Sequence, residues 1–236
     1  MRKSHLCIIL PIYNPHVGWN DELVFSLSQL ENHFKDIDFV VAIVNDGSAK
    51  CLMQEMESIS SAFPFVEYYQ YASNKGKGYA IREGVKLVSS DYYIYTDWDL
   101  PFGQSAVFET YRLLASNSCQ LIIGRRDDTY FKSLPFLRKV VSKSLLIANY
   151  LTTGFKVADT QAGLKGLSKY AGEELLLTKV NGFIFEWEFI RACLRKKMTF
   201  QFIDIQVVNP LKFSNFSLTT ILKELIAYLK ILVVNK

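Results

Sequence analysis

Apolar runs of strand length alternate with helical patterns along the first half of the chain, and this order limits the fold more than any other feature. Such alternation is typical of βαβ units, in which parallel strands form one sheet with helices on both faces. The runs are rich in Val, Ile and Tyr, as expected for strands that are buried on both sides. The expected strands are residues 6–12, 39–44, 66–71, 92–96 and 120–123. The expected helices begin near Asp21, Cys51, Gly76 and Gln104.

The second half of the 236-residue chain is less regular. Its pattern predicts a helix over 135–151, a polar, glycine-containing stretch over 159–166, a helix over 185–196 and a strand over 199–208. No internal repeat or Pro/Gly/Ser-rich linker divides the chain, and its length suits one large domain. We therefore expect a single α/β domain over 1–236 with a mostly parallel, Rossmann-like sheet.

Composition and charge exclude several classes of protein. The formal net charge of +4 is too small to indicate nucleic acid, and no basic stripe accompanies the aromatic residues. The four cysteines are far apart and without CxxC spacing, so zinc and a disulfide framework are not expected. The apolar run at the start is short and ends at Pro11, unlike a secretory signal, which predicts an intracellular protein.

No stretch approaches the roughly 20 uninterrupted apolar residues that span a bilayer. The most apolar stretch, 218–234, is interrupted by Lys223, Glu224 and Lys230. Its Leu and Ile residues recur at helical spacing, which predicts an amphipathic helix. That helix either packs onto the domain or lies on a membrane surface, and the mean hydropathy of +0.10 is compatible with both.

Polar residues follow five successive expected strands. Ligands of open α/β sheets bind beyond the carboxyl ends of the strands, so these residues are candidates for a site. They lie at 13–14, 45–48, 73–78, 97–99 and 124–127. The sequence thus predicts one polar rim along one edge of the sheet.

Asp97-Trp98-Asp99 directly follows an apolar strand. Two carboxylates one residue apart can approach one Mg²⁺ or Mn²⁺ and leave positions free for phosphate oxygens, although acids after a strand also serve as turn formers or helix caps.

The glycines of 74–80 allow a backbone to approach a phosphate, or they form an ordinary turn. Asn45-Asp46-Gly47-Ser48 is a type I turn, or its Asp accepts hydrogen bonds from a nucleoside.

The order of Pro11-Ile12-Tyr13-Asn14, the 45–48 turn, the 74–78 loop, the 97–99 acids and Gly124-Arg125-Arg126 resembles family-two glycosyltransferases of the GT-A fold. Residues 159–165 and 183–188 look most like the dolichyl-phosphate glucosyl- and mannosyltransferase branch. Such enzymes move a sugar from a nucleotide diphosphate to a polyprenyl phosphate with inversion at the anomeric carbon. The nucleotide-sugar half would be about 1–125, and the acceptor-side half, with the C-terminal helix, about 126–236.

The resemblance also implies roles for individual residues. The nucleotide sugar would contact Pro11, Tyr13, Asn14, Asp46, Lys77, Asp97 and Trp98. The divalent ion would be held by Asp97 and Asp99, and the catalytic residues would be Asp99, Asp159 and Arg126. The acceptor phosphate would be bound by Arg126, Arg138 and Ser142, and the sugar or acceptor pocket bordered by Gln161 and Glu186.

The nature of the acceptor decides whether a general base is needed. A phosphate monoester is largely dianionic at neutral pH and is already a nucleophile, whereas a hydroxyl acceptor needs a base, for which Asp159 or Glu186 is the candidate. Six basic residues interleave with apolar ones between 125 and 143, which suits a face that meets anionic lipid or an ordinary amphipathic helix. Arg138 and Ser142 are four residues apart and share a helical face.

The favoured hypothesis is therefore a metal-dependent, inverting transferase that moves a hexose from a UDP- or GDP-sugar to a polyprenyl phosphate. It would work at the cytoplasmic face of a membrane, as a peripheral protein. A family-two enzyme that glycosylates a saccharide hydroxyl is the first alternative, and a catalytically silent nucleotide-sugar-binding protein is the second. A nucleotidyltransferase is disfavoured because the early glycine-rich loop of that class is missing after Ile12.

Overall fold

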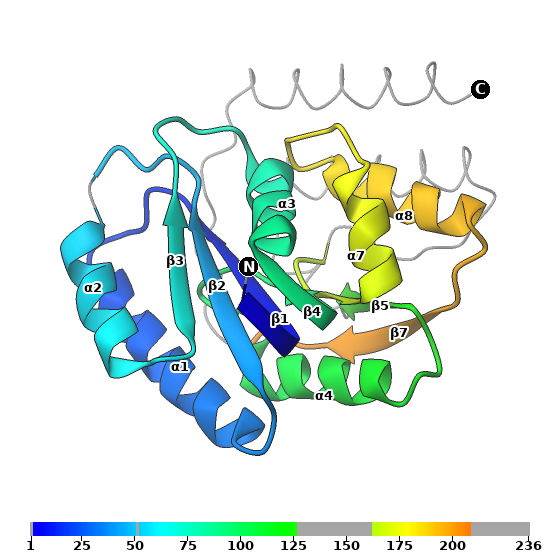
Figure 1. Cartoon of the computed structure of the whole chain (residues 1–236), viewed down its shortest axis with the longest axis horizontal. Coiled ribbons are helices and arrows are strands. Elements are labelled where there is room, and N and C mark those ends of the chain that lie inside the picture. Colours follow the sequence, from blue (N-terminus) through cyan, green and yellow to red (C-terminus); the bar gives the residue numbers. More distant parts are fainter. Residues whose placement is uncertain (1, 51, 127–161, 209–236) are drawn as a thin grey trace.

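The computed structural model describes residues 2–50, 52–126 and 162–208 of the chain (Figure 1). Seven strands form one sheet in the order β3-β2-β1-β4-β6-β5-β7. The strands are β1 (Arg2–Ile12), β2 (Phe39–Asn45), β3 (Val66–Gln70), β4 (Val88–Tyr95), β5 (Leu121–Arg126), β6 (Lys165–Ser168) and β7 (Phe200–Ile205). The helices are α1 (Trp19–Phe34), α2 (Met53–Ala62), α3 (Lys77–Leu87), α4 (Gly103–Ala115), α7 (Lys169–Leu176) and α8 (Phe185–Arg195).

All strands but β6 run in one direction. β1 pairs in parallel with β2 and β4, β2 with β3, and β5 with β7, whereas β6 lies antiparallel between β4 and β5. The carboxyl ends of the six parallel strands therefore meet at one edge of the sheet. The expected α/β fold with a mostly parallel sheet is confirmed.

Helices cover both faces of the sheet (Figure 1). Alternate residues of β1 point to opposite sides, because side chains along a strand alternate. Leu6 and Ile8 pack in a core with α1, α2 and α4, whereas Cys7 and Ile9 pack in a second core with α3, α7 and α8. Burying one such aliphatic side chain contributes roughly 1.5–3 kcal/mol, so both cores stabilise the sheet that positions the site.

The structure contains the five strands expected in the first half and the four helices expected to begin near residues 21, 51, 76 and 104. It also contains the helix expected near 185 and the strand expected near 199. The strand β6 and the helix α7 were not expected. For β6 the reason is that Lys165–Ser168 has only four residues and includes a glycine. Gly166 fits there because an added Cβ would lie 2.5 Å from Thr110 Cγ2 of α4. The helices expected over 135–151 and 218–234 lie outside the described residues.

Two further expectations concern the cysteines and the membrane. Cys7, Cys119 and Cys193 are buried free thiols, as expected, and burial raises the pKa of Cys193 to about 12. Cys51 lies outside the described residues. Among the helices of the described ranges, none is both long and apolar enough to cross a bilayer.

Candidate active site

The acidic pair and the glycine-rich loop meet at the carboxyl edge of the sheet. Asp97 and Asp99 follow β4, and Lys77 is the first residue of α3. The Lys77 Nζ atom donates to Asp97 Oδ1 at 2.6 Å, and the Lys77 side chain is only 16% exposed. The fold therefore joins two motifs that are 20 residues apart in the sequence.

The charges of this cluster are strongly coupled. Burial and the neighbouring Asp97 carboxylate raise the pKa of Asp99 from 3.8 to about 6, against the opposing effect of Lys77. Burial alone would lower the pKa of Lys77, but Asp97 and Glu186 outweigh it and the pKa is raised. Lys77 is therefore held as an ammonium, whereas burial and the nearby Asp97 disfavour the ionised form of Asp99.

The two acids suit a divalent cation that also binds a substrate. Across the described ranges, no group of three or more His, Cys, Asp or Glu side chains is placed to hold a metal ion. Mg²⁺ is commonly held by one or two carboxylates together with water and substrate phosphates. Burial, and after it the neighbouring Asp97, disfavours the ionised form of Asp99, and a bound cation would favour that form. The two carboxylates therefore fit Mg²⁺ or Mn²⁺ if a diphosphate completes the coordination.

Asp46 organises the glycine-rich loop. Its carboxylate is 3% exposed and accepts hydrogen bonds from Tyr71 Oη (2.7 Å), Asn74 Nδ2 (2.8 Å) and the backbone N–H groups of Lys75 (2.7 Å) and Gly76 (2.9 Å). Four donors from one loop therefore converge on one carboxylate. The nucleoside contact implied for Asp46 stays a prediction, whereas its role as the support of the 71–76 loop was missed by sequence reasoning.

Gly47 lets the 45–48 turn lie directly on this loop. Its φ is +67°, and an added Cβ would lie 2.3 Å from the backbone carbon of Ser73. The turn is also tied to the end of β1, since the Asn14 N–H donates to Ser48 Oγ at 2.9 Å and Asn14 Oδ1 accepts from the Ala49 N–H at 2.8 Å. The β1 end, the turn and the loop thus form one connected rim.

The other residues expected at the nucleotide are placed as follows. Pro11 lies in β1, and Tyr13 follows that strand with a side chain that is 51% exposed. The Trp98 ring packs against the rings of His16, at 5.4 Å between centroids, and of Trp19, at 6.3 Å. Trp98 therefore anchors the acidic loop to α1, and its contact with a nucleotide sugar stays a prediction.

A buried ion pair lies near the acidic corner, the name used here for Asp97, Asp99 and Lys77. The Lys165 Nζ atom lies 3.6 Å from Glu186 Oε1, and the two side chains are 0% and 5% exposed. Lys165 also donates to the carbonyl oxygen of Ala162. Next to it, an added Cβ on Gly163 would lie 2.6 Å from Asp97 Oδ2, so the 162–163 backbone lies against the acid. Burial raises the pKa of Glu186 despite the opposing charges of Lys165 and Lys77.

Glu186 was expected to border the sugar or acceptor pocket, and that role stays a prediction; Lys165 and Gly163 were missed by sequence reasoning. The signal available was a lysine within the otherwise apolar segment Ala162-Gly163-Leu164-Lys165-Gly166-Leu167. A charged residue in such a segment is either at its exposed edge or paired inside. Here it is paired inside the protein.

Arg82, another residue that sequence reasoning missed, locks α3 to the segment before α8. Its guanidinium is 6% exposed and donates to Thr178 Oγ1 at 3.1 Å, to the Val180 carbonyl oxygen at 2.8 Å and to Asn181 Oδ1. The Gly78 N–H donates in turn to the Asn181 carbonyl oxygen at 2.8 Å. The start of α3, which carries Lys77, is thereby tied to the 178–181 segment at two positions.

On the acceptor side, only part of the expected site is described. Arg126 ends β5, and its charge acts on the Glu186 carboxyl. Arg125 instead pairs with Asp204 at 2.6 Å. The positions of Arg138, Ser142, Asp159 and Gln161 lie outside the described residues, so their roles stay predictions.

The buried pair permits a test by substitution. We expect Lys165→Met to lower the free energy of unfolding by about 3 kcal/mol, because it leaves Glu186 buried without its closest cation. Adding Glu186→Gln to that variant removes the uncompensated charge and should recover most of the loss. Urea unfolding of the two single variants and the double variant measures this coupling, and strictly additive losses would contradict it.

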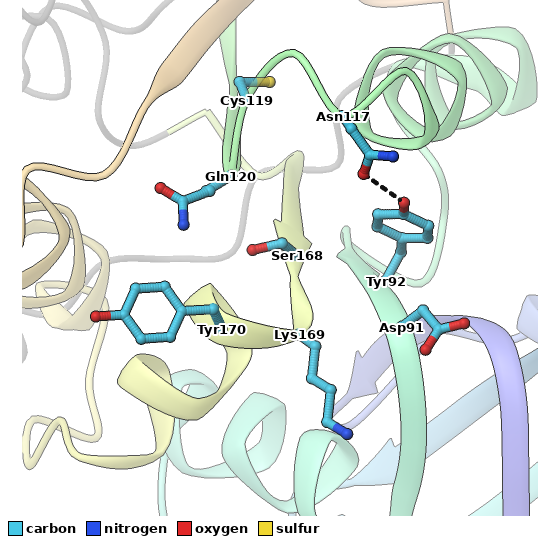
Figure 2. A pocket seen from close by; sticks show the side chains of 8 residues that line it. All are labelled: Asp91, Tyr92, Asn117, Cys119, Gln120, Ser168, Lys169 and Tyr170. Atoms are coloured by element: carbon cyan, nitrogen blue, oxygen red, sulfur yellow. Dashed lines mark hydrogen bonds between the residues drawn. The ribbon is translucent and has the colours of Figure 1, made fainter.

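A separate groove of about 410 Å³ lies at the opposite edge of the sheet (Figure 2). Its lining includes Tyr92 near the start of β4, Gln120 just before β5 and Ser168 at the end of the antiparallel β6. In Figure 2 the Tyr92 hydroxyl donates to Asn117 Oδ1, at 3.0 Å. These positions are at the amino ends of the parallel strands, so the groove is distinct from the acidic corner.

Comparison with known proteins adds family evidence. A family model described as "Glycosyl transferase family 2" matches residues 7–176. The chain is 28% identical over 155 residues to the putative glycosyltransferase CsbB of Bacillus subtilis, covering 61% of this chain and 46% of that protein. It is 24% identical over 161 residues to the dolichol-phosphate mannosyltransferase of Pyrococcus furiosus, covering 67% and 44%. The chain thus spans about half the length of these two relatives.

A solved structure shows a similar fold. Glucosyl-3-phosphoglycerate synthase from Mycobacterium tuberculosis, in complex with Mn²⁺, UDP-glucose and phosphoglyceric acid, superposes with a TM-score of 0.68. The identity is 15%, and the match covers 96% of this chain and 78% of that one. At this identity the likeness concerns the fold alone.

Proposed function

The chain belongs to glycosyl transferase family 2, and from this premise we propose that it transfers a hexose from a UDP- or GDP-linked sugar to a polyprenyl phosphate. The observation that carries the proposal is the acidic corner, where Asp97 and Asp99 lie beside Lys77 at the first turn of α3. Two carboxylates and an ammonium at the carboxyl edge of an α/β sheet suit a nucleotide diphosphate with its cation.

The proposed reaction is a single displacement with inversion. An oxygen of the acceptor phosphate forms a bond to the anomeric carbon while the bond from that carbon to the diphosphate oxygen breaks. The electron pair of the broken bond stays on the nucleoside diphosphate. A divalent cation, when bound by Asp97 and Asp99, would offset the negative charge that develops on this leaving group.

The residues of the chain contribute binding and orientation. Asp46 holds the 71–76 loop, and the loop and Arg82 together hold Lys77, whose ammonium faces the same corner. The charge of Arg126 reaches Glu186 from the acceptor side. We propose that Arg126, with Arg138 and Ser142, binds the acceptor phosphate, and that Gln161 borders its pocket.

A phosphate acceptor is favoured by the state of Glu186. A hydroxyl acceptor needs a base to take its proton, and Glu186 and Asp159 are the two candidates. Glu186 is 4% exposed and pairs with Lys165, so its carboxylate is not presented to a substrate. A polyprenyl phosphate needs no base, because its second pKa lies near 6. The named activity of the Pyrococcus furiosus relative supports the same acceptor class.

The test uses radiolabelled UDP- and GDP-sugars with Mg²⁺ or Mn²⁺ and undecaprenyl or dolichyl phosphate. We expect a labelled product that partitions into organic solvent and releases its sugar in mild acid, as a sugar phosphodiester does. A water-soluble product formed with saccharide acceptors would instead favour the hydroxyl acceptor. Nucleotide-sugar binding without any transfer would favour a silent binding protein.

A further inference from the structure

The Lys77 ammonium is bound to Asp97, one of the two acids proposed to hold the metal ion. Its ammonium lies 2.6 Å from Asp97 Oδ1, a distance typical of a strong charge-assisted hydrogen bond. The other oxygen of this carboxylate, Oδ2, lies against Gly163, where an added Cβ would be 2.6 Å away. Oδ1 of Asp97 is therefore already bound by an ammonium, and the Gly163 backbone lies close to Oδ2.

A divalent ion alone would find a weak site at this corner. Among the residues that the structure describes, Asp97 and Asp99 are not joined by a third His, Cys, Asp or Glu placed to complete a metal site. Lys77 neutralises one of the two carboxylates and would repel the incoming cation. The ion must therefore compete with the ammonium for Asp97.

A nucleotide diphosphate changes this balance. Its oxygens supply the ligands that the protein lacks, and they also offer a new partner to the displaced ammonium. Lys77 lies in the first turn of α3, where the helix dipole favours an anion, and the Glu186 charge also acts on it. The lysine can therefore leave Asp97 for the diphosphate without losing an anionic partner.

We propose that Lys77 acts as a resident cation that holds Asp97 until metal and nucleotide arrive together, so that each strengthens binding of the other. This inference rests on the proposed function, since it assigns a task to a residue of the same site. Lys77 is a positioning residue in this role, because it acts through Asp97 and the diphosphate. By linkage, the nucleotide must tighten the metal by the same factor as the metal tightens the nucleotide.

The test measures Mn²⁺ binding from the EPR signal of the free ion, with and without UDP or GDP. For the wild-type chain we expect weak Mn²⁺ binding that the nucleotide tightens at least about 10-fold, within the usual range of coupling between sites. For Lys77→Met we expect Mn²⁺ alone to bind at least about 5-fold more tightly than to the wild type. The nucleotide should then tighten Mn²⁺ binding by less than about 3-fold. Calorimetric titration of the nucleotide checks that the two coupling factors agree.

Matched variants separate the lysine from general effects. Lys86→Met makes the same change on the same helix at an exposed side chain, and it should leave Mn²⁺ binding as in the wild type. Lys77→Arg keeps the positive charge and should keep the weak binding of Mn²⁺ alone. Lys77→Gln serves as a second neutral variant if Lys77→Met does not fold, as judged by circular dichroism.

Two outcomes would overturn the inference. One is a neutral Lys77 variant that folds and binds Mn²⁺ alone within twofold of the wild type. The other is a wild-type chain whose Mn²⁺ affinity is unchanged by either nucleotide. Asp99→Asn distinguishes these failures from failure of the proposed function: if that variant keeps full Mn²⁺ binding with nucleotide present, the acidic corner is not the metal site and both proposals fall. If it loses Mn²⁺ while Lys77→Met resembles the wild type, only the role of Lys77 falls.

Discussion

Asp99→Asn should abolish sugar transfer and at the same time make the metal-free protein more stable. The first effect follows from the role proposed for Asp99, since an amide is a far weaker ligand than a carboxylate for a hard cation. Loss of a group that stabilises charge on a leaving group typically costs about 10²–10³-fold in rate. Because Asp97 and Asp99 are the two carboxylates proposed to hold the cation, we expect a loss at the upper end of this range.

The gain in stability follows from the pKa of Asp99. This carboxyl has a pKa of about 6 in the folded protein, against 3.8 for an unperturbed aspartate, so folding disfavours its ionised form. The difference corresponds to at most about 3 kcal/mol, present above pH 6 and absent below pH 4, where the carboxyl is protonated in both states. The neutral amide of Asn removes this penalty at every pH.

The measurement is a pair of thermal unfolding series between pH 4 and pH 8, in the presence of EDTA. We expect the variant to melt several degrees above the wild type at pH 8 and at a similar temperature at pH 4, since 1 kcal/mol shifts a domain of this size by roughly 2–4 °C. Asp91→Asn makes the same change within β4, where the side chain is exposed and pairs with His5. That control should transfer sugar normally and show no such gain.

Two results would contradict this account. Transfer at the wild-type rate by Asp99→Asn would remove the cation from the mechanism. A variant that is less stable than the wild type at pH 8 would show that the ionised Asp99 carboxylate stabilises the folded protein in the absence of a ligand.

Asp46→Ala should be the most destabilising substitution at the site and should also eliminate donor binding. The carboxylate is buried and accepts hydrogen bonds from four donors of the 71–76 loop, two of which are backbone N–H groups. Each buried donor left without a partner costs about 1–3 kcal/mol. We expect the free energy of unfolding to fall by about 3 kcal/mol or more, with some of the donors recovered by water.

The loss of donor binding has a structural cause. The loop that Asp46 holds leads directly into α3 and sets the position of Lys77, 20 residues before Asp97. Once the loop is free to move, binding must also order it, and we expect nucleotide affinity to fall by at least about 100-fold. Urea unfolding and calorimetric titration with UDP and GDP measure the two effects.

Gly47→Ala provides an independent test of the same arrangement. The added methyl group would lie 2.3 Å from the Ser73 backbone, at a positive φ that disfavours alanine. Gly47→Ala should therefore lower both the free energy of unfolding and the nucleotide affinity, as Asp46→Ala does, without removing a carboxylate. Asp36→Ala, at an exposed position just after α1, is the matched control and should be neutral. If Asp46→Ala binds nucleotide normally, the loop does not depend on this carboxylate.

Much of the fold was predictable because it depends on patterns that are local in sequence. The buried parts of β1 and β2 are nearly continuous apolar runs, and the helices of the first half show a helical period in the sequence. The strand β6 was missed for a physical reason: four residues are too few to show a period, and its antiparallel place between β4 and β5 depends on contacts with residues far away in the chain. Glycine is required at position 166 because the side chains of α4 leave no room for a Cβ, and not because of a local turn.

At the site, the residues that follow the strands were identifiable from the sequence, while their partners were not. The acids at 97 and 99, the turn at 45–48 and the loop at 74–78 were all expected at one rim, because parallel strands end at one edge. The pairing of Lys77 with Asp97 and the burial of Lys165 beside Glu186 involve residues 20 and 21 positions apart. No pattern in a single sequence reports such pairs.

The amino-acid sequence by itself determined the class of fold, the edge of the sheet that carries the chemistry and the kind of groups found there. These properties follow from hydrophobic period and from the rule that strands of one direction end together. Only the tertiary structure decided how the charged groups pair. Asp46 binds the loop, Glu186 lies beside Lys165, and Lys77 donates to Asp97. Electrostatic interactions depend on distance and burial in space, and those are fixed only when the chain has folded.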